Sequence, residues 1–206
     1  MKRGLFITVE GGEGVGKSTN IEFIKGLISA HNVKCIVTRE PGGTPLAEEI
    51  REVLIATREE EFVSETELLL MFAARAQHLH QKILPALEQG IWVISDRFTD
   101  ATYAYQSGGR GVPSEKVALL ENFVQGDVRP NLTLLLDAPI EVGMSRARNR
   151  GKLDRFEEEE VEFFNRVREN YLQRAKVEPN RFKIIDATQS LDSVQSDIES
   201  EISLLF

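Results

Sequence analysis

Features of secreted and membrane proteins are scarce in this sequence. One cysteine, Cys35, occurs among the 206 residues, so no internal disulfide can form, and this favours a reducing, cytoplasmic location. No apolar run approaches the roughly 18 residues that a membrane-spanning helix requires. A glycine-rich stretch follows the first short apolar run, residues 4–9, so we expect neither a signal peptide nor a membrane anchor.

Positive charge is also in deficit. The chain carries 25 lysine and arginine residues against 33 aspartate and glutamate residues, a net charge of −8. An acidic protein is poorly suited to general binding of nucleic acid or of anionic membranes, so any anionic ligand must be held by a local basic site. With 41% hydrophobic residues, the chain is long enough to form one domain, 1–206, with a full core.

Short apolar runs alternate with longer segments of helical periodicity. This alternation predicts an α/β fold in which a parallel sheet is flanked by helices. The expected strands are residues 4–9, 34–38, 91–95, 132–136 and 182–186. The expected helices are residues 17–30, 45–55, 65–89, 114–125, 139–148, 157–177 and 190–204.

A glycine-rich loop follows the first expected strand. Gly11, Gly16, Lys17 and Ser18 satisfy the pattern G-x-x-x-x-G-K-[ST] between a strand and a helix, which is typical of a phosphate-binding loop. Its backbone N–H groups bind phosphate oxygens, the lysine reaches the β and γ phosphates, and the serine hydroxyl ligates Mg²⁺. We expect the whole loop to bind ATP: Gly11, Gly12, Glu13, Gly14, Val15, Gly16, Lys17, Ser18 and Thr19.

Two other expected strands end in an aspartate, Asp96 and Asp137. Ligands of open α/β sheets lie beyond the carboxyl ends of the strands, so either carboxylate could approach the metal. Asp96 is followed by Arg97, which places a carboxylate for Mg²⁺ beside a guanidinium for phosphate. Asp137 is equally suited to cap the helix that follows it. The sequence therefore predicts a magnesium site formed by Ser18 and Asp96.

Arginines gather in the middle of the chain's second half. A phosphate loop alone occurs in GTPases, ATP-driven machines and small-molecule kinases, and this sequence has no N-K-x-D segment for reading guanine. The stretch "SRARNRGKLDRFE", residues 145–157, contains Arg146, Arg148, Arg150 and Arg155. Such side chains neutralise transferring phosphates, so we expect an arginine-rich flap at about 148–158 that closes over ATP. A solvated basic loop is the alternative interpretation.

Several motifs together resemble those of bacterial thymidylate kinases, over nearly the whole chain. They are "EGGEGVGKST", "TREPGGT", "MFAARAQH", "SDRFTDATYAYQSGGRG" and "RARNRGKLDRFE". The resemblance implies a P-loop NTPase fold, like that of adenylate kinase, with a five-stranded parallel sheet. It also implies transfer of the γ phosphate of ATP to dTMP, with Mg²⁺, in a homodimer. Two alternatives stay open: a kinase of another pyrimidine deoxynucleotide such as dUMP or dCMP, and a non-kinase nucleotide-binding switch.

The resemblance also assigns roles to individual residues around the phosphates and the sugar. Lys17 and the flap arginines Arg150 and Arg155 become the catalytic candidates, together with Arg97. Arg51 resembles the arginine that binds the dTMP phosphate, with Arg97 as its partner. Glu13 resembles an acid that faces the deoxyribose, and Tyr105 resembles the residue that crowds the 2′ position, with Gln106 beside it.

The two bases receive their own candidates. Phe72 and Arg75 lie three apart on an expected helix, so they share a face on which a ring could stack on thymine and a guanidinium reach O4. Such a donor disfavours cytosine, which carries an amino group there. A core Phe beside a snorkelling Arg is the alternative. By resemblance, Thr102 binds the pyrimidine N3, whereas Arg146 and the loop containing Ala187 border adenine. His78 and His80 are two apart and are not expected to bind a metal.

Overall fold

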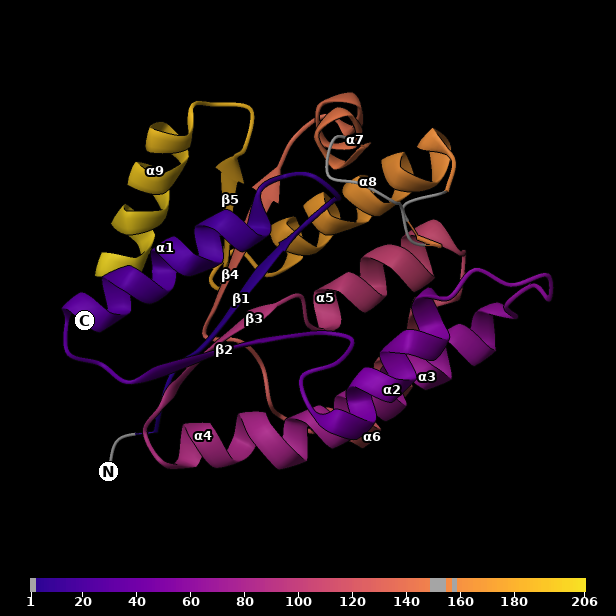
Figure 1. The fold of residues 1–206 in the computed structure, drawn as a ribbon, viewed down its shortest axis with the longest axis horizontal. Coiled ribbons are helices and arrows are strands. Elements are labelled where there is room, and N and C mark those ends of the chain that lie inside the picture. Colours follow the sequence, from indigo (N-terminus) through magenta and orange to yellow (C-terminus); the bar gives the residue numbers. More distant parts are fainter. Residues whose placement is uncertain (1–2, 149–154, 157–158) are drawn as a thin grey trace.

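The computed structural model describes residues 3–148, 155–156 and 159–206, which form an α/β fold with a central sheet between helices (Figure 1). The strands are β1 (Phe6–Gly11), β2 (Cys35–Arg39), β3 (Trp92–Asp96), β4 (Leu132–Asp137) and β5 (Phe182–Asp186). Their order in the sheet is β2-β3-β1-β4-β5, and all neighbouring strands run parallel. The predicted fold class, a five-stranded parallel sheet flanked by helices, is confirmed.

Helices cover both faces of the sheet. They are α1 (Lys17–Ala30), α2 (Pro45–Ile55), α3 (Ser64–His78), η1 (Leu79–Ile83), α4 (Leu84–Glu88), α5 (Thr99–Thr102), η2 (Tyr103–Gly109), α6 (Ser114–Gln125), α7 (Ile140–Arg148), α8 (Val161–Val177) and α9 (Leu191–Ser203). Helices α1 and α9 pack on one face, whereas α4, α5 and α8 pack on the other. No helix in the described part of the chain is long and apolar enough to span a bilayer.

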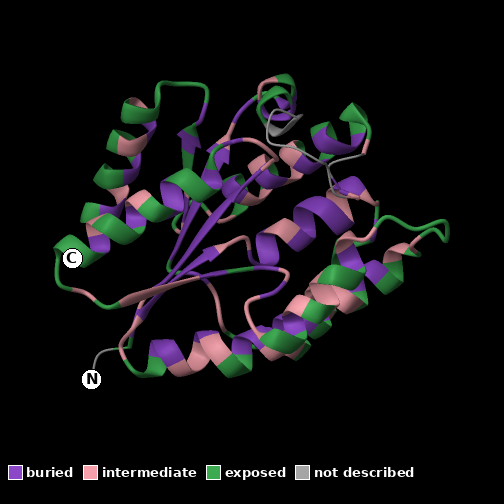
Figure 2. Ribbon diagram, in the orientation of Figure 1, coloured by how far each residue is buried: buried purple, intermediate pink, exposed green. Residues whose placement is uncertain are grey.

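The central strands β1, β3 and β4 are buried on both faces and are mostly purple in Figure 2, whereas the edge strands β2 and β5 include intermediate and exposed residues. Side chains of successive strand residues point to opposite faces. Along β1, Ile7 and Val9 therefore contact the core beneath α1 and α9, whereas Phe6 contacts the core beneath η1 and α4. This burial on both sides explains why the strands appear in the sequence as short, nearly continuous apolar runs.

The expected helices 17–30, 45–55 and 114–125 and the expected strand 182–186 are confirmed to the residue, and the other expected elements are found with small shifts. The expected helix 65–89 is a continuous run of α3, η1 and α4, in which η1 is a π-helical turn. Pro85 follows this turn and has no N–H to donate four residues back, so a regular α-helical pattern cannot continue through it. Helix α8 begins at Val161, not at 157, and residues 157–158 lie outside the described chain.

One helical region was missing from the prediction. Residues 99–109 form α5 and the π-helical η2, directly after strand β3. The buried face of this segment carries polar side chains, including Asp100, Thr102 and Gln106. An apolar periodicity is therefore weak there, because the helix buries hydrogen-bonding groups where most helices bury hydrocarbon.

The carboxyl ends of β1 and β3 form the edge at which the functional groups gather. Val9 is the parallel partner of Asp96, so the loop after β1 and the residues after β3 leave the sheet side by side. This is the position where open α/β sheets hold their ligands.

Candidate active site

A cleft of about 490 Å³ lies beyond these strand ends. Its walls come from the phosphate loop, the loop after β2, helices α2 and α3, the end of β3, α5 and η2. Fifteen of the predicted site residues line it: Glu13, Gly14, Val15, Gly16, Lys17, Ser18, Thr19, Arg51, Arg75, Asp96, Arg97, Thr102, Tyr105, Gln106 and Arg146. Gly11, Gly12, Phe72, Arg155 and Ala187 do not line it.

The lining of this cleft is positively charged although the protein is acidic. Six basic side chains contribute to it: Lys17, Arg39, Arg51, Arg75, Arg97 and Arg146. Three carboxylates oppose them: Glu13, Glu40 and Asp96. Among the described residues of the lining, cations exceed carboxylates by three, or by two when Glu48, the partner of Arg39 outside the lining, is counted. In a chain of net charge −8, this excess favours a ligand that carries several negative charges.

The phosphate loop has the backbone geometry that its glycines allow. At Gly11, φ is +136°, and an added Cβ would lie 2.3 Å from the Leu136 carbonyl oxygen, so a side chain cannot fit. Gly16, with φ of +91°, precedes the first residue of α1, whose N-terminus faces the loop. The Lys17 Nζ donates to the Gly12 carbonyl at 2.7 Å. Burial and the nearby Arg97 lower the pKa of Lys17, against the opposing effect of Glu13 and Asp96.

Arg97 lies at the centre of the phosphate end. Its guanidinium donates to the Gly11 carbonyl at 2.8 Å, to the Glu13 carboxylate at 2.6 Å, and to the hydroxyls of Tyr105 and Tyr171 at 2.9 and 3.0 Å. Its φ is +67°, a conformation that non-glycine residues rarely adopt outside functional sites. Burial opposes the charge of Arg97, but its neighbours outweigh this and raise its pKa further above its usual value.

Ser18 and Asp96 both line the cleft, as predicted, and offer the oxygen ligands that Mg²⁺ prefers. The Asp96 Oδ1 atom is buried and has no hydrogen-bond partner among the described residues. A buried carboxylate oxygen without a partner is costly unless a cation or water approaches it. A hydroxyl, one carboxylate and phosphate oxygens suit Mg²⁺, which keeps several water ligands. The described residues form no cluster of three His, Cys, Asp or Glu ligands.

Arg75 lines the cleft from α3 and is only 3% exposed. Its Nε donates to Glu40 Oε2 at 2.7 Å, and its Nη2 donates to the Thr102 hydroxyl at 2.8 Å. The third nitrogen, Nη1, is buried without a hydrogen-bond partner among the described residues. A buried N–H group of a cation without a partner costs about 1–3 kcal/mol or more, so it indicates the place where a ligand acceptor binds.

The prediction that Phe72 contacts the base needs correction. Phe72 and Arg75 do share a face, since the guanidinium lies 4.8 Å above the Phe72 ring centre. The ring, however, is 2% exposed and packs in the core with Leu68, Tyr103 and Val117, outside the lining of the cleft. Met71, four residues before Arg75, lines the cleft instead. The alternative interpretation of Phe72 as a core residue therefore describes its position.

Three further acceptor candidates, Arg51, Tyr105 and Gln106, line the cleft. Arg51 lines the cleft from α2 and donates to the Pro41 carbonyl at 2.9 Å. The Tyr105 hydroxyl donates to Glu13 at 2.8 Å, and Arg97 lies 4.7 Å above the Tyr105 ring centre. Gln106 is 1% exposed and donates to Glu67 at 2.9 Å, which fixes its amide.

The flap is described only in part. Arg150 lies outside the described residues, and the side chain of Arg148 is not described. Arg155 is held away from the phosphate loop, because its guanidinium donates to the Leu54 carbonyl at 2.9 Å and to Glu67 at 2.7 Å. The prediction that Arg155 faces the phosphates does not match this position.

The two residues expected near adenine come together. The Arg146 Nη1 donates to the Ala187 carbonyl at 3.1 Å, and Arg146 lines the cleft. Ser190, at the end of this loop, caps α9 by accepting from the Ser193 N–H at 3.2 Å.

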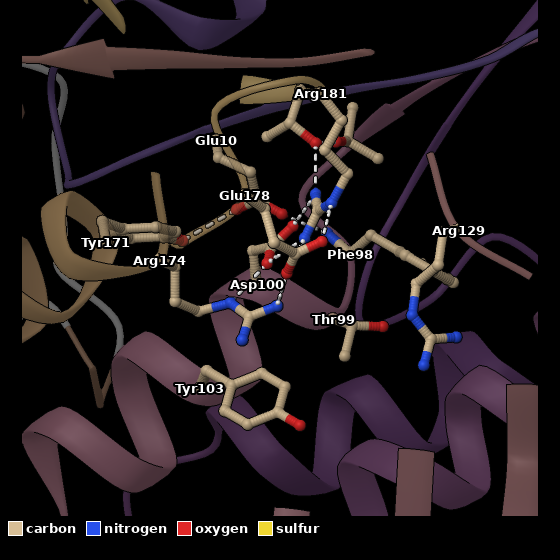
Figure 3. A network of polar contacts seen from close by, with 12 residues as sticks. Glu10, Phe98, Thr99, Asp100, Tyr103, Arg129, Tyr171, Arg174, Glu178 and Arg181 are labelled. Carbon is tan, nitrogen blue, oxygen red and sulfur yellow. Dashed lines mark hydrogen bonds and ion pairs between the residues drawn. The ribbon is translucent and has the colours of Figure 1, made fainter. Parts of the chain in front are cut away.

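A second polar cluster lies behind the cleft (Figure 3). The buried Asp100 accepts from Arg174 at 2.6 Å and from Arg181 at 2.7 and 2.9 Å, and Glu178 pairs with both arginines. Nearby, Glu10 accepts from the Tyr171 hydroxyl at 2.8 Å and from the Phe98 N–H at 2.7 Å. Burial, together with Asp100, raises the pKa of Glu10 to about 8, although Arg97 opposes this. The cluster anchors the start of α5 to α8 and β5.

Two residues that matter here were not singled out from the sequence. Tyr171 accepts a hydrogen bond from Arg97, and Glu40 pairs with Arg75. Tyr171 lies in an amphipathic helix without any local motif. Glu40 lies in the "TREPGGT" stretch, so its place in a loop after a strand was the available signal.

Comparisons with known proteins agree with one another. A family model described as thymidylate kinase matches residues 9–198. The chain is 58% identical to a thymidylate kinase of Pseudomonas putida over 96% of its own length and 94% of the relative. It is 59% identical to a thymidylate kinase of Pseudomonas syringae pv. tomato, over 95% and 93% of the two chains. The crystal structure of a thymidylate kinase from Ehrlichia chaffeensis matches with a TM-score of 0.79 and 31% identity, over 98% and 99% of the chains.

Proposed function

The chain belongs to the thymidylate kinase family, so it phosphorylates dTMP with ATP as donor, and we propose how the cleft performs this transfer. ATP binds with its β and γ phosphates on the loop 11–19, and dTMP binds between Arg51 and Arg75. The dTMP phosphate then lies in line with the γ phosphate, and transfer proceeds without a covalent enzyme intermediate.

One observation carries the acceptor assignment: the Nη1 atom of Arg75, a residue of the cleft lining, has no hydrogen-bond partner among the described residues. Thymine offers an O4 carbonyl to such a donor, whereas cytosine offers an amino group that cannot accept. The Thr102 hydroxyl accepts a hydrogen bond from Arg75, and in the proposed complex it faces the N3 edge of the pyrimidine. Met71 provides apolar contact for the ring in place of Phe72.

The phosphate end supplies charge. Lys17 moves from the Gly12 carbonyl to the β and γ phosphate oxygens, because a charged phosphate is a stronger acceptor than a carbonyl. Arg97 and Arg51 hold the acceptor phosphate. Glu13, bonded to Arg97 and Tyr105, keeps both oriented beside the deoxyribose. Arg150 is the remaining candidate for a catalytic arginine in the flap. Arg155 can contribute only if its hydrogen bond to Glu67 breaks.

Ser18 and Asp96 would hold Mg²⁺, Ser18 through its hydroxyl and Asp96 through the carboxylate whose Oδ1 lacks a partner among the described residues. When bound, the ion neutralises charge on the phosphate oxygens. Arg146, bonded to the Ala187 carbonyl, lies where adenine would stack on it.

We also propose a cytoplasmic homodimer. Helices α3 and α6 pack against each other and expose Leu69, Leu119 and Phe123, which are 57%, 67% and 83% exposed. Adjacent exposed apolar side chains on neighbouring helices favour a protein interface. Replacing Phe123 with aspartate should shift the chain toward a monomer in sedimentation velocity, and an unchanged sedimentation coefficient would contradict this surface.

An acceptor panel tests the proposed site. With ATP and Mg²⁺, kcat/KM should be highest for dTMP and lowest for dCMP. We expect dUMP to follow dTMP within about tenfold, because one buried methyl group is worth roughly 1 kcal/mol. Equal turnover of dCMP and dTMP would contradict the assignment of Arg75 to O4.

A further inference from the structure

A buried chain of polar side chains leads from Arg75 to the end of strand β2. The Glu40 carboxylate accepts from Arg75 through Oε2 and faces the Nδ1 atom of His78 through Oε1, at 2.9 Å. The Nε2 atom of His78 lies 2.6 Å from the Thr38 hydroxyl. His78, Glu40 and Thr38 are 0%, 5% and 6% exposed. Glu40 lines the cleft, whereas His78 and Thr38 do not.

The hydrogen positions in this chain follow from the chemistry of its members. Burial raises the pKa of Glu40, but Arg75 and His78 outweigh it, so the pKa lies below its usual value and Glu40 is ionised. An ionised carboxylate only accepts, so Nδ1 of His78 carries a hydrogen. In the neutral imidazole, Nε2 then accepts from the Thr38 hydroxyl. Both Glu40 oxygens are thereby occupied, and its charge compensates that of Arg75.

This arrangement fixes the direction of the unpartnered donor. The guanidinium is planar, so two anchored nitrogens determine where the third one points. Glu40 anchors Nε and Thr102 anchors Nη2. Because Glu40 is itself held by His78, the orientation of Nη1 depends on a residue that does not line the cleft.

The loop after β2 is fitted to the same chain. A Cβ at Gly43 would lie 2.4 Å from His78 Nε2 and 2.7 Å from Thr38 Oγ1, and its φ is +92°. The loop backbone therefore packs directly on the imidazole. Gly43, the second glycine of "EPGG", lets the loop backbone lie against His78 and Thr38 at this point.

We propose that His78 is a positioning residue for base selection: through Glu40 it holds Arg75 so that Nη1 faces the O4 carbonyl of thymine, while Thr38 holds the imidazole. The inference rests on the proposed function, because it assumes that Arg75 reads the base. It adds a selectivity determinant outside the cleft lining.

Two substitutions at His78 form a matched pair. His78→Leu keeps roughly the side-chain volume and removes both hydrogen bonds, whereas His78→Asn keeps an N–H donor near the position of Nδ1. Steady-state kinetics would give kcat and KM for dTMP and KM for ATP. Calorimetry would give dissociation constants for dTMP and for 5-methyl-dCMP, in which an amino group replaces O4.

For His78→Leu we expect the dTMP KM to rise about tenfold, since a lost hydrogen bond to a charged group costs about that factor or more. The KM for ATP should stay unchanged, and the preference for dTMP over 5-methyl-dCMP should fall about tenfold. His78→Asn should restore most of the affinity for dTMP and most of the preference for dTMP over 5-methyl-dCMP. If the role of His78 is purely structural, His78→Leu would instead weaken binding of dTMP and 5-methyl-dCMP equally, or raise the KM for both dTMP and ATP. Either result would overturn the inference.

Thr38→Val covers the case in which His78→Leu does not fold, as judged by circular dichroism. It removes only the outer hydroxyl, and we expect the preference for dTMP over 5-methyl-dCMP to fall by about threefold, less than a full hydrogen bond. An unchanged preference in the folded Thr38→Val protein would overturn the inference. If the wild type does not phosphorylate dTMP, the proposed function fails; if it does and selectivity survives, only the role of His78 fails.

Discussion

Two groups of arginines in this protein differ in how they are paired. Behind the cleft, Arg174 and Arg181 face Asp100 and Glu178, two cations against two anions. Among the described residues of the cleft lining, six cations face three carboxylates; Arg39 pairs with Glu48 outside the lining, and the Nη1 atom of Arg75 has no hydrogen-bond partner. Burial does not separate the groups, because Arg174 and Arg181 are partly exposed and the cleft cations range from the buried Arg75 to the exposed Arg39.

The difference indicates what each group is for. A balanced cluster satisfies its own charges and holds α5, α8 and β5 together without any ligand. An unbalanced cluster of directed donors is costly in the free protein and gains its partners from a ligand. Pairing among the described side chains, more than arginine content, therefore distinguishes the binding group from the structural one.

Lys17→Ala should produce the largest change in the cleft group. We expect kcat to fall on the order of 10³, because Lys17 stabilises charge on the phosphates in the transition state. Stability should change little, since its Nζ bonds only loop carbonyls in the free protein. Coupled-assay kinetics with urea unfolding as a control would check both, and a folded variant with near-normal kcat would exclude the phosphate-loop assignment.

Asp100→Asn should produce the largest change in the structural group. It removes the charge between Arg174 and Arg181, which are 18% and 11% exposed in their side chains. Breaking a buried ion pair costs about 3 kcal/mol, so the free energy of unfolding in urea should fall by about that amount. The dTMP KM measured well below the unfolding midpoint should be little changed. A large rise in KM with unaltered stability would place Asp100 in the binding group instead.

Arg51→Ala should weaken binding of the acceptor and leave the chemistry nearly intact. We expect the dTMP KM to rise by on the order of 10², with a smaller effect on kcat, since the phosphate contact exists in both ground and transition states. The KM for ATP serves as the internal control. An unchanged dTMP KM would move the acceptor phosphate away from α2.

Tyr105 should have the smallest of these effects, on sugar selection. A 2′-hydroxyl pushed against its ring, or left unbonded, costs about 1–3 kcal/mol, so the wild type should prefer dTMP over ribothymidine monophosphate by about tenfold or more. Tyr105→Phe, which keeps the ring, should retain the preference, whereas Tyr105→Ala should reduce it. An undiminished ratio in an active Tyr105→Ala protein would assign the sugar check to another residue.

Much of the sheet and of the phosphate end could be predicted because the signals are local. The loop 11–19 is a contiguous motif, and Asp96 and Arg97 directly end an apolar strand. The five strands were predictable because burial on both faces produces continuous apolar runs.

The base end could be predicted only in part. Successive helical residues point about 100° apart, so the sequence could not decide whether Phe72 or its neighbour Met71 faces the cleft. The carboxylate partner of Arg75, Glu40, is 35 residues away along the chain, and that of Arg155, Glu67, is 88 residues away. Only the tertiary fold reveals these pairs. Helix α5 was missed because Asp100 and Thr102 are buried polar residues, which apolar periodicity does not detect.

One thermal unfolding experiment tests the distinction between the two groups most directly. The wild type, Arg51→Ala and Arg181→Ala are each melted with and without saturating dTMP, which stabilises only a protein that binds it. We expect Arg181→Ala to lower the ligand-free Tm by several degrees and to keep the increment given by dTMP. Arg51→Ala should keep the ligand-free Tm and lose most of the increment. A variant that loses both ligand-free Tm and the dTMP increment would contradict the proposal that pairing distinguishes binding arginines from structural ones. So would the reverse pattern, in which Arg51→Ala lowers the ligand-free Tm and Arg181→Ala loses the increment.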